Sequence, residues 1–145
     1  MSVVFDTNIY IGYKAPRQLR GALLSVVVLH ELVAGAADKM ELQALRLFKV
    51  EAERAGRLLT PTNEDWWEAG RVLYALRHGL KSRAGGRTPA LPAAEVQRIM
   101  RDVLIARTVR RAGAALITDN LADFKRIARF CAVRVVSGKE FFGQS

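Results

Sequence analysis

Short, continuously apolar segments recur along this chain, and polar or acidic residues follow most of them. The segments are VVF (3–5), LLSVVVL (23–29), AALIT (114–118) and AVRVV (132–136), with RLLTPT (57–62) as a weaker candidate. Runs of this kind are typical of strands that are buried on both faces of a sheet. Stretches with helical features separate them, so the pattern predicts an α/β fold with a mainly parallel sheet.

The intervening stretches carry helix signals. Leu42, Leu45 and Phe48 recur one turn apart, and Gly56 is suited to end their helix. Asn63 is predicted to cap the next helix. The predicted helices cover residues 30–37, 39–56, 64–80, 92–112 and about 121–129.

Length and composition favour one domain, residues 1–145, with a core of its own. Lys and Arg outnumber Asp and Glu by 23 to 14, and the net charge of +9 favours a polyanionic partner. The single cysteine, Cys131, excludes an internal disulfide and suits a reducing cytosol. No secretory signal or membrane span is visible, so a cytoplasmic protein is expected.

Acidic residues follow three of the predicted strands. Asp6 follows 3–5, Glu31 follows 23–29, and Asp119 and Asp123 follow 114–118. Each acid alone suits a helix cap, a turn or a first helical turn. Ligand sites of open parallel sheets lie beyond the carboxyl ends of the strands, so these acids are expected to share one edge.

Asp102 is a further acid, placed in the middle of the helix 92–112. Its helical neighbours are Ile99, Ile105, Ala106 and Val109. They mark a buried stripe, whereas Arg98, Arg101, Arg107 and Arg110 mostly mark other faces. An ionised Asp near a core is costly without compensation, so a site or a buried ion pair with a nearby arginine is expected.

Several carboxylates in one place repel each other, and hard divalent cations remove that conflict. The sequence offers little softer coordination, because His30 and His78 lie far apart and Cys131 has no partner. Mg²⁺ or Mn²⁺ held by carboxylates can activate water for attack at phosphorus. Together with the basic chain, this donor set points to a nuclease.

Four motifs resemble those of a known family: VVFDTN, VVLHELVAGA, RDVLIARTVRRAG and ALITDNLADF. In this order, from Asp6 to Phe124, the chain is similar to PIN-domain ribonucleases and most like the VapC-type toxins of toxin–antitoxin pairs. The resemblance implies a three-layer α/β/α PIN-like domain with a central mainly parallel sheet. It also implies metal-dependent cleavage of RNA.

The resemblance assigns the catalytic and metal-binding acids to Asp6, Glu31, Asp102 and Asp123. Asp119 lies where the family varies, and both a ligand and a cap remain open for it. The supporting polar residues are Thr7, Asn8, Thr118 and Asn120. Asn8 is expected to orient Asp6.

Two departures from the family stand out. Only 24 residues separate Asp6 from Glu31, so the first helical hairpin must be short. The loop over residues 81–92, rich in Gly, Pro and basic residues, matches no motif.

RNA is the expected substrate, with structured RNA such as tRNA as the family expectation. Trp66 is predicted to be core, whereas Trp67 and Tyr74 are expected to be partly exposed. The resemblance further implies a VapB-like antitoxin partner and a homodimer. The basic candidates for RNA contact are Lys14, Arg17, Arg20, Lys81, Arg83, Arg87, Arg107, Arg110 and Arg111.

Three other functions compete with the toxin. One is an RNA-binding domain of this fold without catalysis, and another is a housekeeping RNA-processing nuclease. A third is a Mg²⁺-dependent phosphatase with Asp6 as nucleophile. The chain lacks the D-x-D spacing of such a phosphatase, because residue 8 is Asn.

Overall fold

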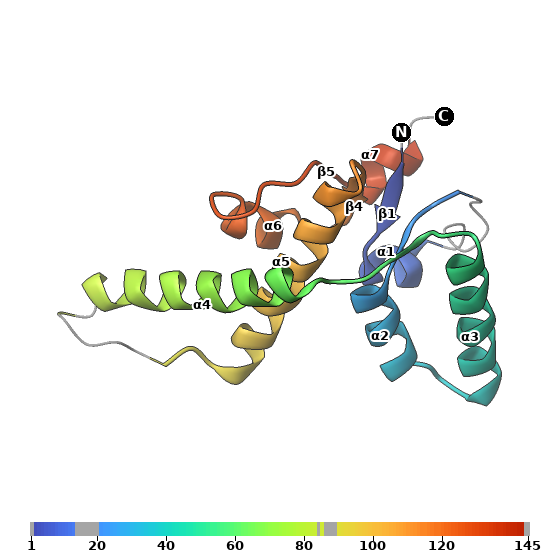
Figure 1. The fold of residues 1–145 in the computed structure, drawn as a ribbon, viewed down its shortest axis with the longest axis horizontal. Coiled ribbons are helices and arrows are strands. Elements are labelled where there is room, and N and C mark those ends of the chain that lie inside the picture. Colours follow the sequence, from blue (N-terminus) through green and yellow to red (C-terminus); the bar gives the residue numbers. More distant parts are fainter. Residues whose placement is uncertain (1, 14–20, 84, 86–89, 144–145) are drawn as a thin grey trace.

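The computed structural model describes residues 2–13, 21–83, 85 and 90–143, without the side chains of 80–83 (Figure 1). Seven helices and five strands lie in these ranges. In chain order they are β1 (Val3–Phe5), α1 (Thr7–Gly12), β2 (Leu24–Ser25), α2 (Val26–Ala34), α3 (Lys39–Arg54), β3 (Leu58–Leu59), α4 (Asn63–Arg83), α5 (Ala93–Arg111), β4 (Ala115–Ile117), α6 (Leu121–Ile127), β5 (Val135–Val136) and α7 (Gly138–Gly143).

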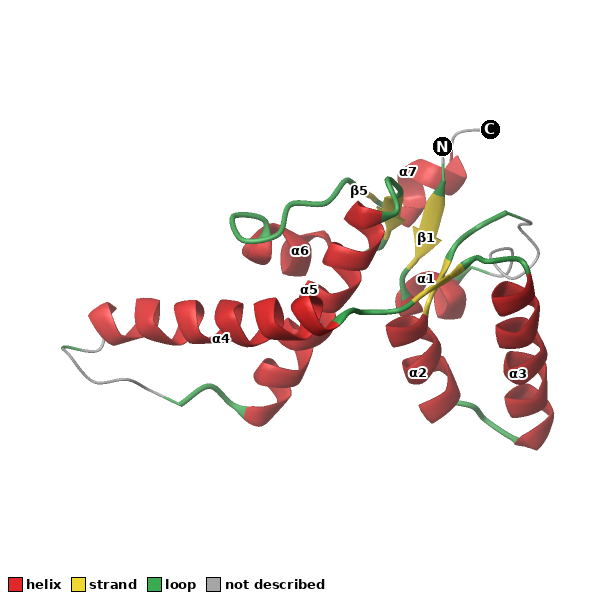
Figure 2. Ribbon diagram, in the orientation of Figure 1, coloured by secondary structure: helices red, strands yellow, loops and turns green. Residues whose placement is uncertain are grey.

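The strands pair in parallel. β4 lies between β1 and β5, with Phe5 opposite Ile117, and β2 pairs with β3. A parallel bridge between Val4 and Leu23 joins the two groups, which gives the order β3-β2-β1-β4-β5. Helices flank this sheet (Figure 2), and the predicted α/β fold with a central parallel sheet is confirmed.

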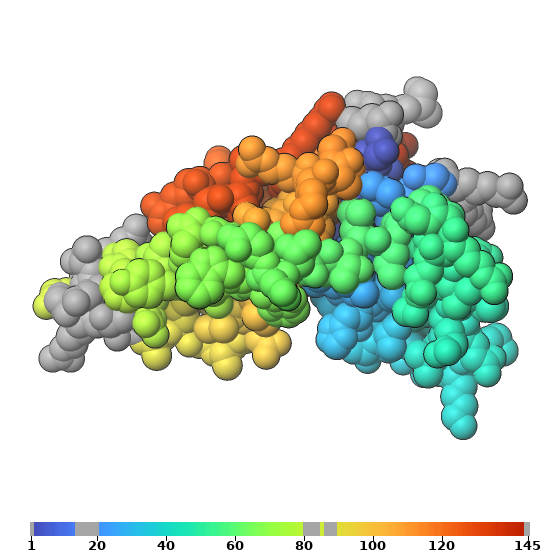
Figure 3. Space-filling view, viewed as in Figure 1, coloured from blue at the N-terminus to red at the C-terminus, as the bar shows by residue number. Residues whose placement is uncertain are grey.

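Helix α5 occupies a central place in the packing. It contacts α2, α4, α6, β2 and β4. Its middle, residues 102–106, is buried all round the helix, and Val103, Ile105 and Val109 pack with Val4 and Leu116 of the strands. Helix α4 packs along α5 and forms a continuous band on the face shown in Figure 3.

The predicted strand 23–29 is wrong after Ser25. The hydroxyl of Ser25 accepts hydrogen bonds from the N–H groups of Val27 and Val28, at 3.2 and 3.4 Å, and caps α2. Residues 26–29 are therefore helical. β-Branched valines are only weak helix formers, so the cap and the burial of Val28 override the local preference.

The other predicted helices are confirmed with small shifts, but the cap of α4 is Thr62 rather than Asn63. The Thr62 hydroxyl accepts from the Asp65 N–H at 3.2 Å, and the Asp65 carboxylate accepts from the Thr62 N–H at 2.9 Å. This reciprocal pair is a capping box. At the end of α3, Gly56 has a φ of +67°, as a terminating glycine requires.

Trp66 is not a core residue, contrary to the prediction. Its side chain is 51% exposed, and the buried stripe of α4 is formed by Asp65, Ala69 and Val72 instead. Trp67 and Tyr74 are exposed, as predicted.

The C-terminal tail contains a helix, α7, that the sequence pattern did not indicate. Phe142 stacks on Tyr13 with ring centroids 4.8 Å apart, and Phe141 meets Phe5 at 5.7 Å. Gly138 is buried where a Cβ atom would lie 2.7 Å from the side chains of Ile9 and Tyr13. A glycine at this position therefore lets α7 approach the residues after β1.

Among the described residues, no helix is both long enough and apolar enough to cross a membrane.

A buried carboxylate anchors α4 to α5. Asp65 is fully buried and accepts hydrogen bonds from Arg107, at 2.8 Å, and from Arg111. Burial alone would raise the pKa of Asp65, but the hydrogen bonds from the two arginines and from the Thr62 N–H lower it to about 2.

Replacing Asp65 with Asn is expected to reduce the free energy of unfolding by about 1–3 kcal/mol at pH 7. The pKa of Asp65 lies below its ordinary value of 3.8. Its contribution is therefore complete above about pH 4 and disappears as the pH falls through 2. Urea unfolding of both proteins from pH 7 to pH 2 measures this. Asp38→Asn, at the N-cap of α3, removes the same charge and is the control, with an expected change below about 0.5 kcal/mol. An equal loss of unfolding free energy from both substitutions would contradict the role of Asp65 in anchoring α4 to α5.

Candidate functional site

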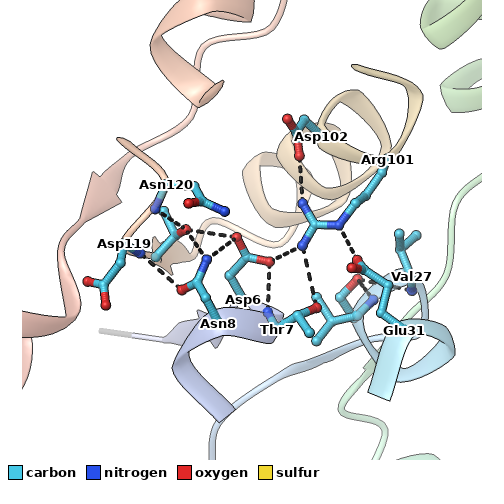
Figure 4. Close-up of polar contacts among 12 residues, drawn as sticks. Asp6, Thr7, Asn8, Val27, Glu31, Arg101, Asp102, Asp119 and Asn120 are labelled. Atoms are coloured by element: carbon cyan, nitrogen blue, oxygen red, sulfur yellow. Dashed lines mark hydrogen bonds and ion pairs between the residues drawn. The ribbon is translucent and has the colours of Figure 1, made fainter. Parts of the chain in front are cut away.

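Three acidic side chains from distant parts of the chain meet at the carboxyl edge of the sheet (Figure 4). Asp6 directly follows β1 and also caps α1, and Glu31 lies in α2. Asp102 comes from the buried face of α5. Asp6 and Asp102 are fully buried, and the Glu31 side chain is 33% exposed.

Neighbouring polar groups hold the Asp6 carboxylate in place. One oxygen accepts from the Thr7 N–H at 2.8 Å, and the other accepts from the Thr118 hydroxyl at 2.7 Å and from the Asn8 amide at 3.3 Å. The Asn8 amide also donates to Thr118 at 3.2 Å, and the Asn120 N–H donates to the same hydroxyl at 3.0 Å. The predicted supporting residues thus surround Asp6.

A guanidinium, that of Arg101, lies between the three acids. Its Nη2 donates to Asp6, its Nε donates to Glu31, and its Nη1 donates to Asp102 at 2.6 Å. Helical periodicity places Arg101 mostly on another face, but the alternative of a buried ion pair between Asp102 and a nearby arginine is what the structure shows. The side chain is long enough to turn back from the edge of the buried stripe. Its position next to Asp102 is the signal that could have identified it.

The charge at this site is not balanced by the described residues. Asp6, Glu31 and Asp102 carry three formal negative charges against one positive charge on Arg101. Burial raises the pKa of Asp102 to about 7, and Asp123 and Asp6 add to the rise, while Arg101 opposes it. The pKa of Arg101 is raised by the surrounding carboxylates against the effect of its burial.

The donor set suits a hard divalent cation. All the converging ligands are carboxylate oxygens, and Oδ2 of Asp102 is buried without a hydrogen-bond partner. Such an orphaned acceptor is costly unless a donor or cation meets it. Within the described ranges, no three Asp, Glu, His or Cys side chains are arranged to hold an ion as they stand. The guanidinium lies between the acids instead.

The two acids after β4 differ in their surroundings. Asp123, in the first turn of α6, is partly buried, and its charge acts on Asp102. Asp119 is exposed, and its carboxylate accepts from the Tyr13 hydroxyl at 3.1 Å and from the Gly138 N–H at 2.9 Å. Asp119 thus ties the end of β4 to α7, and its carboxylate points away from Arg101 (Figure 4).

A cavity of about 920 Å³ opens beside the acids. Glu31, Arg101 and Asp123 line it, and the exposed side chains of Ile11 and Trp66 contribute apolar surface. The volume is in the range of small-molecule and nucleotide sites.

The basic residues predicted to contact RNA are only partly described. Lys14, Arg17, Arg20 and Arg87 lie outside the described residues, and Lys81 and Arg83 lie in α4 without described side chains. Arg107 and Arg111 bind Asp65, and Arg110 donates to the Ala132 carbonyl at 3.4 Å. These three arginines line a separate cavity of about 330 Å³ with Phe130 and Cys131.

No protein-family model and no curated protein sequence matches the chain, whereas solved structures do. A chain of VapBC-1 from nontypeable Haemophilus influenzae is 21% identical. The match covers 94% of this chain and 98% of that chain with a TM-score of 0.53. A chain of DNA-bound VapBC from Salmonella typhimurium gives the same identity and coverage with a TM-score of 0.52. A chain of FitAB bound to an IR36 DNA fragment is 16% identical over 93% of this chain and 94% of that chain, with a TM-score of 0.51. The predicted resemblance to the VapC-type PIN domain is confirmed at the level of the fold.

In metal-free protein, Asp102→Asn is expected to raise the melting temperature by roughly 3–8 °C at pH 8. The pKa of Asp102 is about 7 in the folded protein and 3.8 ordinarily, so ionisation of Asp102 destabilises the fold as the pH rises from about 4 to 7. The gain should therefore shrink at pH 5. Thermal unfolding in EDTA at both pH values measures it, and a variant that melts lower than the native protein at pH 8 would refute it.

Proposed function

We propose that this chain, which has the PIN-domain fold, is a metal-dependent endoribonuclease and the toxin of a type II toxin–antitoxin pair. The observation that carries the proposal is the convergence of Asp6, Glu31 and Asp102 on one cationic group at the carboxyl edge of the sheet. A binding domain gains nothing from buried carboxylates next to phosphate. The same acids are useful to an enzyme that must hold a metal ion there.

In this proposal Asp6, Glu31, Asp102 and Asp123 hold Mg²⁺ or Mn²⁺. The bound ion would activate water and neutralise charge on the phosphorus oxygens. The chain's own residues hold the acidic side chains in fixed positions. Asn8 and Thr118 fix the orientation of Asp6, and the packing of α5 in the core fixes Asp102.

The cavity beside the acids is the proposed RNA site. The flat, half-exposed ring of Trp66 offers an unpaired base a stacking surface, and the net charge of +9 favours RNA as a polyanion. Structured RNA such as tRNA is the proposed substrate class.

Residues 1–145 act in this proposal as one PIN-like domain in the cytoplasm. The similarity to chains of VapBC complexes supports a VapB-like antitoxin as partner, together with a homodimer. A housekeeping RNA-processing nuclease would share all the chemistry. Growth arrest on expression of the chain, relieved by the product of a neighbouring gene, distinguishes the toxin.

Cleavage of RNA is expected to require both a divalent ion and Asp102. Purified protein, freed of any bound partner, is incubated with total cellular RNA in Mn²⁺ or Mg²⁺, and new RNA ends are mapped by sequencing. Discrete ends should disappear with EDTA. Asp102→Asn should reduce the rate of cleavage by at least about a hundredfold. Asp119→Asn is the matched control, because its carboxylate faces Tyr13 and Gly138, and it should retain cleavage within about threefold.

Other outcomes would favour the alternatives. RNA binding without cleavage, unchanged by EDTA, would indicate a binding domain of this fold. Hydrolysis of small phosphomonoesters would favour the phosphatase. Full cleavage by the Asp102→Asn protein would refute the proposed site.

Trp66→Ala is expected to weaken the binding of single-stranded RNA about tenfold or more, since base stacking on an aromatic ring contributes about 1–3 kcal/mol. Trp67→Ala is the control, because Trp67 is more exposed on the same helix and does not line the cavity. Fluorescence anisotropy with the Asp102→Asn protein, which prevents cleavage, measures both. Equal losses from the two substitutions would contradict a base site at Trp66.

A further inference from the structure

Arg101 is the centre of the acid cluster, and the proposed function does not account for it. Its three ion pairs reach three separate elements: the end of β1, α2 and its own helix α5. Of the basic side chains that the structure describes, it alone pairs with any of the three acids. A planar guanidinium has five N–H donors in a fixed fork, and here Nε, Nη1 and Nη2 each donate to a different carboxylate.

The guanidinium occupies one oxygen of each carboxylate that a divalent ion would bind. Arg101 is bonded to Oδ1 of Asp6, Oε1 of Glu31 and Oδ1 of Asp102. An ion held by these atoms would lie within a few ångströms of the guanidinium, where two cations repel strongly in a partly buried site. This repulsion makes the guanidinium and the ion compete for the three acids.

Space next to the Arg101 side chain would let the guanidinium move away from the acids. Its side chain is 18% exposed and lines the 920 Å³ cavity, which offers it space outside the cluster. Asp6 would keep its place, because Thr7, Thr118 and Asn8 hold it independently. Glu31 has Arg101 as the only side-chain partner that the structure describes.

We propose that Arg101 is a built-in counter-ion that competes with the divalent metal for Asp6, Glu31 and Asp102 and must leave them before the ion binds. This inference rests on the proposed metal-dependent function. A protein whose binding-competent state is a minor fraction shows an apparent Kd that is raised in inverse proportion to that fraction. Arg101 therefore sets the ion concentration at which the site fills.

The first test measures Mn²⁺ binding without RNA, by electron paramagnetic resonance of the free ion. Arg101→Gln should lower the Kd about tenfold or more. Arg98→Gln is the matched control. Arg98 lies one turn earlier on α5 and lines the same cavity, but no ion pair is described for it. Its loss removes the same charge, and its effect should stay below about threefold.

The second test uses the native protein, so it does not depend on the folding of a variant. The Nε–Hε resonance of Arg101, assigned by its absence in Arg101→Gln or Arg101→Lys, is followed by NMR during a titration with Mg²⁺. In the metal-free protein, the Nε–H group of Arg101 donates a hydrogen bond to Glu31. As the site fills, the chemical shift of this hydrogen should change to that of a guanidinium without this hydrogen bond, and its exchange with water should become faster.

The outcomes separate this inference from the proposed function. Tighter binding in Arg101→Gln but not in Arg98→Gln, with release of the Arg101 resonance, supports the competition. Equal, measurable affinity in all proteins, or an unchanged resonance at saturating Mg²⁺, overturns the competition and leaves the nuclease proposal intact. Absence of divalent-ion binding from every protein would overturn both.

Discussion

The ion cluster around Arg101 is the interaction on which the arrangement of this edge of the protein depends. Two carboxylates with no exposed surface and a third that is half-buried would repel each other without a cation between them. The guanidinium supplies that cation and joins β1, α2 and α5 through it. Because the guanidinium carries one positive charge against three carboxylates, the site keeps a net negative formal charge. Asp102 also keeps a buried oxygen without a partner.

The same residues serve the fold and the site. Asp6 caps α1 through the Thr7 N–H and is also the most firmly held acid of the cluster. A cap and a ligand were alternatives at the level of the sequence, yet one carboxylate has oxygens enough for both roles. Asp119 differs, because both of its oxygens are used to attach Tyr13 and α7 to the end of β4.

Much of the fold could be predicted from local patterns, and the errors have identifiable causes. The apolar run 23–29 predicts too long a strand, because a series of valines does not show that Ser25 caps a helix. Helical spacing predicts that Trp66 is a core residue, although the buried stripe of α4 lies one position earlier, where Asp65 is held by two arginines of α5. A local side-chain cap decided the first outcome, and arginines of a distant helix decided the second.

The sequence by itself determined the alternation of strands and helices and the acids that follow the strands, because both depend on residues close together in the chain. It also indicated that Asp102 lies on a buried face. Only the tertiary structure decided which cation meets these acids. Arg101 and Glu31 are 70 residues apart, and Arg101 and Asp6 are 95 apart. Helical periodicity assigns a face to a Cα position, but a long arginine side chain is drawn to the nearest uncompensated charge, wherever folding has placed it.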